Sequence, residues 1–234
     1  MLGIIGAMDM EVEQLLKEMT DVTEKTVGFT KFYAGKLFSV PVCLARCGIG
    51  KVHAALCAQA MILEYEIDAM LNIGVAGALL DSLNIAHIVV AKSAVQHDID
   101  TTPFGDPLGM ISGPNIVHIP CDEKLSSLLE EAAREAELPY ACAAIATGDQ
   151  FIAELSKKDF LADHFGAGAC DMEGGAIAQC CYEMQIPYAA CRAISDTRSG
   201  NEQEYIVKAR EACRAEEKLL RCFAALYLKE KEQK

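Results

Sequence analysis

Short apolar runs alternate along the chain with longer stretches in which apolar residues recur every three to four positions. The short runs predict buried β-strands, and the longer stretches predict amphipathic helices. The predicted strands are Leu2–Ala7, Phe32–Phe38, Val40–Ala45, Ala69–Ile73, Ile85–Ala91, Ala94–Gln96, Tyr140–Ala146, Ala169–Asp171 and Tyr188–Ile194. The predicted helices are Asp9–Met19, Val52–Tyr65, Asp122–Glu137, Glu173–Met184 and Glu202 to about Lys229.

This alternation predicts one α/β domain over residues 1–234, with a mixed, largely parallel central sheet flanked by helices. The pair Phe32–Phe38 and Val40–Ala45 is predicted to form a hairpin. No internal repeat and no change in composition marks a second domain. The segment Asp98–Pro120 is rich in Gly and Pro and is predicted to be a long functional loop.

The charge balance narrows the possible partners. The chain of 234 residues carries 21 Lys and Arg against 34 Asp and Glu, a net charge of −13. Because so acidic a surface repels phosphate groups, we expect neither nucleic acid nor an anionic membrane surface as a partner. No apolar stretch approaches the roughly 20 residues that a membrane-spanning helix needs.

The eleven cysteines form no Cys-x-x-Cys pair, and most lie in apolar runs. This is typical of free thiols, which pack like small hydrophobic side chains. The first residues lack the basic start of a signal peptide, so we expect a reducing, cytoplasmic location. Cys43, Cys47 and His53 have no further residues at ligand spacing. We therefore predict no metal site and no cofactor.

Four polar clusters directly follow predicted strands: Asp9-Met-Glu11, Gly74-Val-Ala-Gly77, Asp171-Met-Glu173 and Arg192-Ala-Ile-Ser195-Asp196. In an open parallel sheet, such positions converge on one crevice. Helix capping or a first-turn acid explains Asp9 and Asp171, since both stand where a helix begins. For Asp196 a cap and a catalytic role both stay open. Paired carboxylates could act as a general acid and a base.

Other catalytic motifs do not fit this sequence. Gly48-Ile-Gly50-Lys51 matches neither a phosphate-binding loop nor a dinucleotide fingerprint, so it predicts only a tight strand-to-helix turn. The chain contains no Gly-x-Ser-x-Gly, no His-Glu-x-x-His and no cysteine signature of nucleophilic catalysis. Hydrolysis through a covalent nucleophile is therefore not expected.

Taken together, six segments resemble the bacterial 5′-methylthioadenosine/S-adenosylhomocysteine nucleosidases in order and spacing. These segments are Gly3-Ile-Ile-Gly-Ala-Met8-Asp-Met-Glu11-Val12, Gly48-Ile-Gly-Lys-Val52, Asn72-Ile-Gly-Val-Ala-Gly77, Thr147-Gly-Asp-Gln-Phe-Ile152, Asp171-Met-Glu173 and Arg192-Ala-Ile-Ser-Asp196. The resemblance runs from Met1 to about Leu226. It implies a fold like that of the nucleoside phosphorylases and cleavage of the bond between adenine N9 and ribose C1′, with a place in methionine salvage.

The resemblance also implies roles for individual residues. Asp196 would protonate adenine N7 with Ser195 orienting its carboxyl, and Glu11 would polarise the attacking water. Glu173 would hold the ribose hydroxyls, assisted by Met172 and Arg192. The remaining implied substrate-binding residues are Phe151, which would stack on adenine, Ile152, whose backbone would read its edge, and Met8, Ile49 and Phe104 around the ribose and the 5′ group.

Two positions depart from the family pattern. Val75 stands where some members carry a Ser that could contact ribose or water, and Asp106 stands where some place an aromatic residue beside the 5′ substituent. The substrate implied is a small nucleoside, but its 5′ group is left open.

Three other functions also stay open: a purine nucleoside phosphorylase of the same fold, an aminodeoxyfutalosine hydrolase, and a non-catalytic nucleoside-binding protein. An acid at Glu11 would repel phosphate, which disfavours the phosphorylase. A homodimer is predicted from the small residues of Val52–Tyr65 and the apolar residues of Asp98–Pro120, with Phe104 reaching a neighbouring subunit. The alternative is that this loop closes as a lid within one chain.

Overall fold

The protein is described by a computed structural model that covers residues 1–232. The strands are β1 (Leu2–Gly6), β2 (Met19–Val27), β3 (Thr30–Leu37), β4 (Val40–Arg46), β5 (Ala69–Asn72), β6 (Val75–Ala78), β7 (Ile88–Gln96), β8 (Ile119–Pro120), β9 (Tyr140–Thr147), β10 (Ala167–Asp171) and β11 (Tyr188–Asp196). The helices are α1 (Asp9–Glu18), α2 (Lys51–Glu64), α3 (Glu123–Glu135), α4 (Leu155–Phe165), α5 (Gly174–Glu183), α6 (Glu202–Glu232) and the 3₁₀ turn η1 (Thr102–Phe104).

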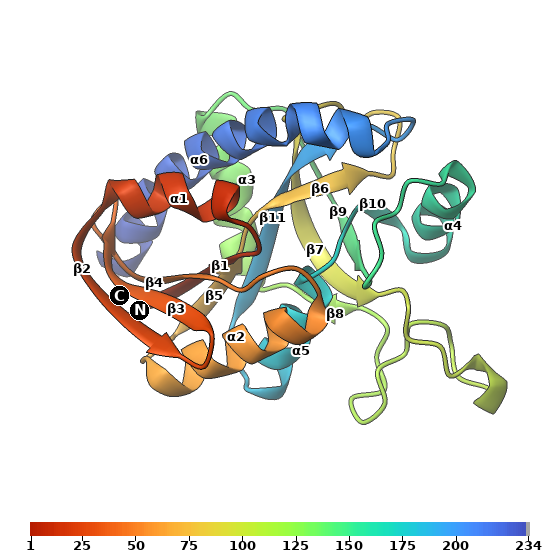
Figure 1. Cartoon of the computed structure of the whole chain (residues 1–234), viewed down its shortest axis with the longest axis horizontal. Helices are drawn as coiled ribbons and strands as arrows, with labels where there is room; N and C mark the ends of the chain where they lie inside the picture. Colours follow the sequence, from red (N-terminus) through yellow and green to blue (C-terminus); the bar gives the residue numbers. More distant parts are fainter. Residues whose placement is uncertain (233–234) are drawn as a thin grey trace.

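All eleven strands belong to one sheet, in the order β2-β3-β4-β1-β5-β11-β6-β10-β9-β7-β8 (Figure 1). β1 pairs in parallel with β4 and β5, and β11 pairs in parallel with β5 and β6. β11 also pairs with β7 in antiparallel fashion, so that β11, β6, β10, β9 and β7 close into a ring. β11 is buried along its whole length, as its apolar sequence requires.

Helices cover both faces of the sheet (Figure 1). α2 and α5 pack on one face through residues such as Met61 and Ile177, and α1, α3 and α6 pack on the other through residues such as Leu15, Leu129 and Phe223. α4 lies at the end of the molecule over a third, smaller apolar cluster. No helix within residues 1–232 has both the length and the apolar character needed to cross a bilayer.

The predicted fold class, an α/β fold with a mixed sheet and flanking helices, is confirmed. Asp122 is the N-cap of α3, as predicted, and its Oδ1 accepts a hydrogen bond from the Leu125 N–H at 2.9 Å. The predicted pair of strands Ile85–Ala91 and Ala94–Gln96 is wrong, because β7 runs unbroken through a register shift between Ala91 and Ser93.

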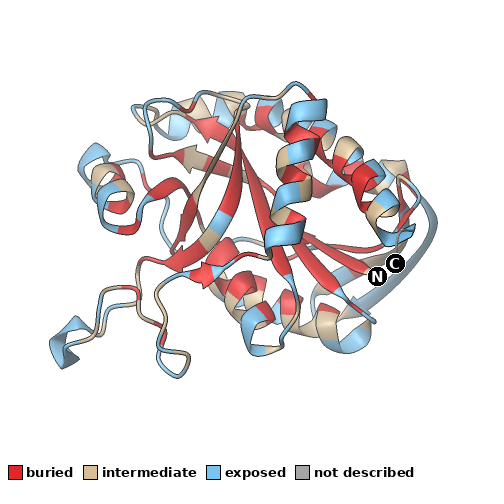
Figure 2. Ribbon diagram, turned by 180° about the vertical axis from the view of Figure 1, so that it is seen from behind, coloured by how far each residue is buried: buried red, intermediate tan, exposed pale blue. Residues whose placement is uncertain are grey.

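Three strands, β2, β6 and β8, and one α-helix were not predicted. β2 is almost entirely exposed at the edge of the sheet, so it carries no apolar alternation. β6 consists of small residues that resembled a turn, and α4 buries a lysine where an apolar residue would mark a helix face. The segment Asp98–Pro120 projects from the body as a long loop, but it includes η1 and ends in β8 (Figures 1 and 2).

Candidate active site

A cavity of about 310 Å³ opens where β1, β10 and β11 end and β6 begins. This volume is at the small end of the range for small-molecule sites. Its lining consists of Ala7, Met8, Glu11, Ile49, Val75, Ala76, Gly77, Gln150, Phe151, Ile152, Cys170, Asp171, Met172, Glu173, Ser195, Asp196 and Tyr205. Every site residue predicted from sequence is among them except Phe104 and Arg192.

Glu11 reaches one side of the cavity from the first turn of α1. Its Oε2 accepts hydrogen bonds from the backbone N–H groups of Ala7 at 2.7 Å and Met8 at 2.9 Å, while Oε1 accepts from Val75 N–H at 3.0 Å. The side chain closes a capping box with Met8, which is the N-cap of α1. Burial raises the pKa of Glu11 above its usual value, while the backbone donors oppose that rise.

Asp196 reaches another side of the cavity from the last position of β11. Its Oδ1 accepts from the Ser195 hydroxyl at 3.0 Å, and its Oδ2 accepts from the Lys158 ammonium at 3.2 Å. Burial raises the pKa of Asp196, and the ammonium and the hydroxyl oppose that rise. Asp196 does not cap α6, because the Asn201 carboxamide accepts the N–H groups at that helix start.

The first residues of β6 separate the two carboxyls. A methyl group added at Gly74 would lie 2.6 Å from Glu11 Oε1, and one added at Gly77 would lie 2.9 Å from Asp196 Oδ2. Three residues of extended chain span about 10 Å. Glycine at these two positions therefore leaves room for both carboxyls, with Val75 and Ala76 forming the floor between them.

Glu173 is the third carboxyl in the cavity, and it explains the Gly48-Ile-Gly50 turn. Its Oε1 accepts from the Gly50 N–H at 2.7 Å, and Gly50 has a φ of +98°, a conformation that favours glycine. Burial and the nearby Asp171 raise the pKa of Glu173 to about 7. The turn thus brings its backbone against a carboxylate of the site, although its sequence matched no phosphate-binding motif.

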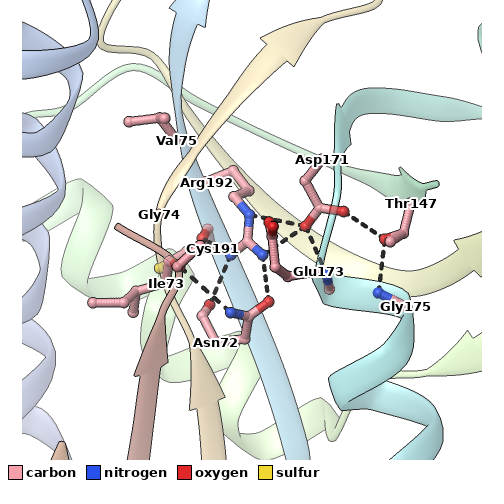
Figure 3. Close-up of polar contacts among 12 residues, drawn as sticks. Asn72, Ile73, Gly74, Val75, Thr147, Asp171, Glu173, Gly175, Cys191 and Arg192 are labelled. Carbon is pink, nitrogen blue, oxygen red and sulfur yellow. Dashed lines mark hydrogen bonds and ion pairs between the residues drawn. The ribbon is translucent and has the colours of Figure 1, made fainter. Parts of the chain in front are cut away.

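Asp171, which also lines the cavity, forms a buried ion pair with Arg192, which does not (Figure 3). Arg192 Nε donates to Asp171 Oδ2 at 3.0 Å, and its other nitrogens donate to the backbone and side-chain oxygens of Asn72. Asp171 also accepts from Thr147 Oγ1 and from the Gly174 N–H. The arginine therefore ties together the ends of β5, β9 and β10, and it does not line the cavity itself.

The expectation that Asp171 caps a helix is right in chemistry but wrong in position. Glu173 occupies the N-cap of α5, and Asp171 bonds the Gly174 N–H from the end of β10. Asp9 lies in the first turn of α1, where it pairs with Arg46 at 3.2 Å on the surface. Asp9 thus has the structural role expected of a first-turn acid.

Comparisons with known proteins place this geometry in a family. Residues 1–226 match the model of the phosphorylase superfamily. A 5′-methylthioadenosine/S-adenosylhomocysteine nucleosidase of Staphylococcus carnosus is 38% identical over 86% of this chain and 88% of its own length. The chain belongs to this nucleosidase family. The resemblance predicted from sequence is therefore confirmed.

Two solved structures show the same fold. The Helicobacter pylori nucleosidase of this name, in complex with a pyrrolidinol ligand, has a TM-score of 0.90 and 31% identity, covering 96% of this chain and 97% of its own. The futalosine hydrolase of H. pylori strain 26695 also has a TM-score of 0.90, with 32% identity over 96% of this chain and 97% of its own.

The residues predicted to lie at a subunit interface include Phe104 and the small residues of α2. Phe104 ends η1 on the projecting loop, 87% exposed and outside the cavity. Of the small residues expected at a dimer interface, Ala54 and Ala58 are buried within the chain. The outward face of α2 instead carries Val52, Leu56 and Leu63.

Sequence reasoning missed three residues near the nucleosidase cavity. Tyr205 lines it from the first turn of α6, with its hydroxyl 3.1 Å from Met8 Sδ and its ring edge-on to Phe151. Lys158 and Glu216 lie behind it, beside Asp196 and the Gly74 N–H respectively. The apolar spacing of the last helix is the only sequence signal near Tyr205 and Glu216, and it does not distinguish them from other residues of that helix. No sequence signal indicates Lys158.

The polar side chains of the nucleosidase cavity are four carboxyls, the hydroxyls of Ser195 and Tyr205, the Gln150 carboxamide and the Cys170 thiol. Within residues 1–232, no three His, Cys, Asp or Glu side chains are placed to hold a metal ion.

Proposed function

We propose that this chain hydrolyses the N-glycosidic bond of 5′-methylthioadenosine and S-adenosylhomocysteine and releases adenine. Residues 1–234 would act as one catalytic unit in methionine salvage. The observation that carries the proposal is the pair of buried carboxyls, Glu11 and Asp196, on either side of one largely apolar cavity. Because all eleven cysteines are free, we place the enzyme in the reducing cytoplasm.

Asp196 is the acid in this mechanism. Its carboxyl proton passes to adenine N7, the bond between N9 and C1′ breaks, and adenine leaves as a neutral base. General acid catalysis of this kind contributes about 10²–10⁴-fold. Burial favours the protonated carboxyl that the step requires, and the Ser195 hydroxyl fixes its orientation.

Glu11 is the base. Loss of adenine leaves positive charge on the ribose ring, which the acidic cavity stabilises. Water then attacks C1′ and gives a proton to Glu11. Three backbone N–H groups favour the ionised form of Glu11 that can accept this proton.

The other cavity residues bind the substrate. Glu173, beside Met172, holds the ribose hydroxyls, and Arg192 supports it from beneath by fixing Asp171. Phe151 stacks on adenine, and the backbone of Ile152 reads its edge. Met8, Ile49 and Val75 surround the ribose and the 5′ group.

The ligand of the H. pylori nucleosidase is consistent with this arrangement. It joins a 4-aminopyrrolopyrimidine to a pyrrolidinol that carries a thioether. These three parts correspond to the base, ribose and 5′-thioether regions proposed for this cavity.

The active enzyme is proposed to be a homodimer. Val52, Leu56 and Leu63 form an exposed apolar face on α2, directly after Ile49 of the cavity. Phe104 is exposed on its loop and does not line its own cavity, so it can complete the 5′ pocket of a second copy. Leu56→Lys is expected to give a monomer by light scattering at micromolar concentration. A wild type that is already monomeric at this concentration overturns the dimer.

A phosphorylase fits this cavity poorly. Binding a phosphate dianion near C1′ calls for cationic side chains. Among the described residues that line the cavity, none is Lys or Arg. Glu11 would in addition repel phosphate from the position of the attacking water.

Aminodeoxyfutalosine hydrolysis is the second candidate, favoured by the likeness to the H. pylori futalosine hydrolase. The test is release of the free base, adenine from methylthioadenosine, S-adenosylhomocysteine, 5′-deoxyadenosine and aminodeoxyfutalosine and hypoxanthine from inosine, each with and without phosphate. We expect turnover of the two thio-substituted nucleosides, no turnover of inosine and no effect of phosphate. Formation of a ribose 1-phosphate product contradicts the proposal, and a kcat/KM highest for aminodeoxyfutalosine selects the second candidate.

A further inference from the structure

A lysine lies completely buried behind Asp196. Lys158, in α4, donates from Nζ to Asp196 Oδ2 at 3.2 Å and to the backbone oxygens of Thr197 at 3.0 Å and Gly200 at 3.2 Å. An ammonium group has three donors and no acceptor. Its three protons are therefore all used, one on the carboxyl and two on the turn that leads from β11 to α6.

Stability alone explains this lysine poorly. An ion pair in the interior recovers its desolvation cost only in part, and apolar side chains of similar size often serve equally well. The neighbouring residues of α4, Leu161 and Phe165, pack into an apolar cluster that an apolar residue at position 158 could extend. The positive charge of Lys158 therefore needs an explanation other than packing.

Asp196 faces several polar and titratable groups from the elements packed against it. These groups are Lys158 of α4, Ser195 of β11, Cys170 of β10, and Glu204 and Tyr205 of α6. Lys158 is the one cation among them. Glu204, whose carboxylate holds the Thr197 backbone N–H, favours a protonated Asp196, and Lys158 favours an ionised one.

We propose that Lys158 is a positioning residue for the acid, which aims the Asp196 carboxyl into the cavity and stabilises the carboxylate left when its proton moves to the base. The inference rests on the proposed role of Asp196 as the acid. The proton on N7 comes from Asp196, which is then reprotonated from solvent.

The first test measures how the charge of Lys158 affects the protonation of Asp196, and it does not depend on enzyme activity. Difference infrared spectra across a pH titration contain the carbonyl band of protonated Asp196, identified as the band that Asp196→Asn lacks. Because an adjacent cation lowers the pKa of a carboxyl, we expect Lys158→Gln to move the midpoint of this band upward by about one pH unit or more. Lys158→Arg, which keeps the charge, is expected to leave the midpoint near that of the wild type.

The second test is a double-mutant cycle on kcat with methylthioadenosine. Lys158→Gln is expected to lower kcat by about tenfold with a smaller change in KM, because the Asp196 carboxyl is no longer held in its orientation toward the cavity. In the Asp196→Asn background the same change is expected to alter kcat by less than about twofold. Lys218→Gln, at an exposed position of α6, is the charge-matched control and is expected to have no effect on either readout.

The outcomes separate the two proposals. An Asp196→Asn variant with nearly full activity rejects the proposed function, whatever Lys158 does. An inactive Asp196→Asn combined with an unmoved carboxyl midpoint in Lys158→Gln rejects only the role of Lys158. Gln retains two amide donors for the turn, and circular dichroism checks that the variant is folded. Lys158→Met, which lacks those donors, should give the same midpoint shift, and the absence of a shift in both variants overturns the inference.

Discussion

The two carboxyls of the cavity are held in different ways. Glu11 accepts three hydrogen bonds, all from backbone N–H groups in the segments that follow β1 and β5. Asp196 accepts one from a hydroxyl and one from an ammonium, both on side chains. The hydrogen-bonded neighbours also differ: Glu216 takes the Gly74 N–H beside Glu11, whereas Lys158 bonds Asp196 directly. The charge of Arg192 also acts on Glu11, but Arg192 is bonded to Asp171.

This difference matches the chemistry proposed for each group. A base that accepts a proton from water benefits from neutral, fixed donors, because these hold it in place without making it a much weaker base. An acid that must give up a proton benefits from a nearby cation that stabilises its carboxylate. The donors to Asp196 can be removed by single substitutions, but those to Glu11 can be disturbed only by moving the backbone.

The largest expected effect is at the acid. Asp196→Asn keeps the size of the side chain, but an amide cannot transfer a proton to N7. We expect kcat for adenine release to fall by about 10²–10⁴-fold with an unchanged circular dichroism spectrum. Retention of more than about a tenth of the wild-type kcat, a loss below roughly 1.4 kcal/mol, would contradict the assignment.

Glu11→Gln tests the other side of the comparison. The amide oxygen can still accept from Ala7 and Met8, but its NH₂ group then faces the Val75 N–H, and the base is lost. We expect a fall in kcat of about 10²-fold or more. If Glu11 were only a first-turn acid, the change would instead cost about 0.3–1 kcal/mol of stability and little activity. Thermal melting and steady-state kinetics on the same preparation separate the two outcomes.

A third substitution disturbs the backbone cradle of Glu11. Gly74 has a φ of +140°, and a methyl group there would lie 2.6 Å from Glu11 Oε1. Gly74→Ala is therefore expected to displace Glu11 and to lower kcat by about 10–100-fold. Gly28→Ala is the matched control, because Gly28 also has a positive φ but its added methyl would meet nothing within 4 Å. Equal kinetic losses in both variants would show that backbone strain, and not Glu11, causes the effect.

The same contrast shows what could be predicted from sequence. Glu11, Glu173 and Asp196 were predicted because each follows a recognisable apolar strand, and strand ends gather at one site. In the structure Glu11 and Glu173 follow the ends of β1 and β10, and Asp196 is the last residue of β11. The cation beside Asp196 was not predicted, because Lys158 comes from α4, whose apolar periodicity the buried lysine itself interrupts.

The rest of the site depends on contacts that local sequence does not encode. Glu216 is one acidic residue in a helix with many, and only its packing against Gly74 sets it apart. Arg192 was predicted to assist Glu173 in holding the ribose hydroxyls. In the structure its five donors are used by Asp171, Asn72 and Cys191. These partners depend on the strand order, which places β5 next to β11 and β10 two strands away from it.

The smallest expected effect concerns Glu216, the buried carboxyl on the base side. Burial raises the pKa of Glu216 to about 8, so the folded protein binds this proton more tightly than the unfolded chain does. The stability that the proton contributes is present in full below the unfolded pKa of about 4.5 and is lost as the pH rises through about 8. Glu216→Gln keeps an acceptor for the Gly74 N–H but does not titrate. We therefore expect the Tm of the wild type to fall more steeply between about pH 5 and pH 8 than that of the variant.

At about pH 8 the Glu216→Gln variant is expected to melt several degrees above the wild type, since about 1 kcal/mol shifts the Tm of a chain of this size by roughly 2–4 °C. Its kcat should change by less than about threefold, because Glu216 lies outside the cavity and Glu11 keeps its backbone donors. Glu217→Gln, one residue along and paired with Arg221 at the surface, serves as the control and should follow the wild-type Tm curve. If the curves of wild type and Glu216→Gln run parallel, the carboxyl beside Glu11 is already ionised at low pH. Glu11 and Asp196 would then differ in their donors alone and not in the charge of their neighbours.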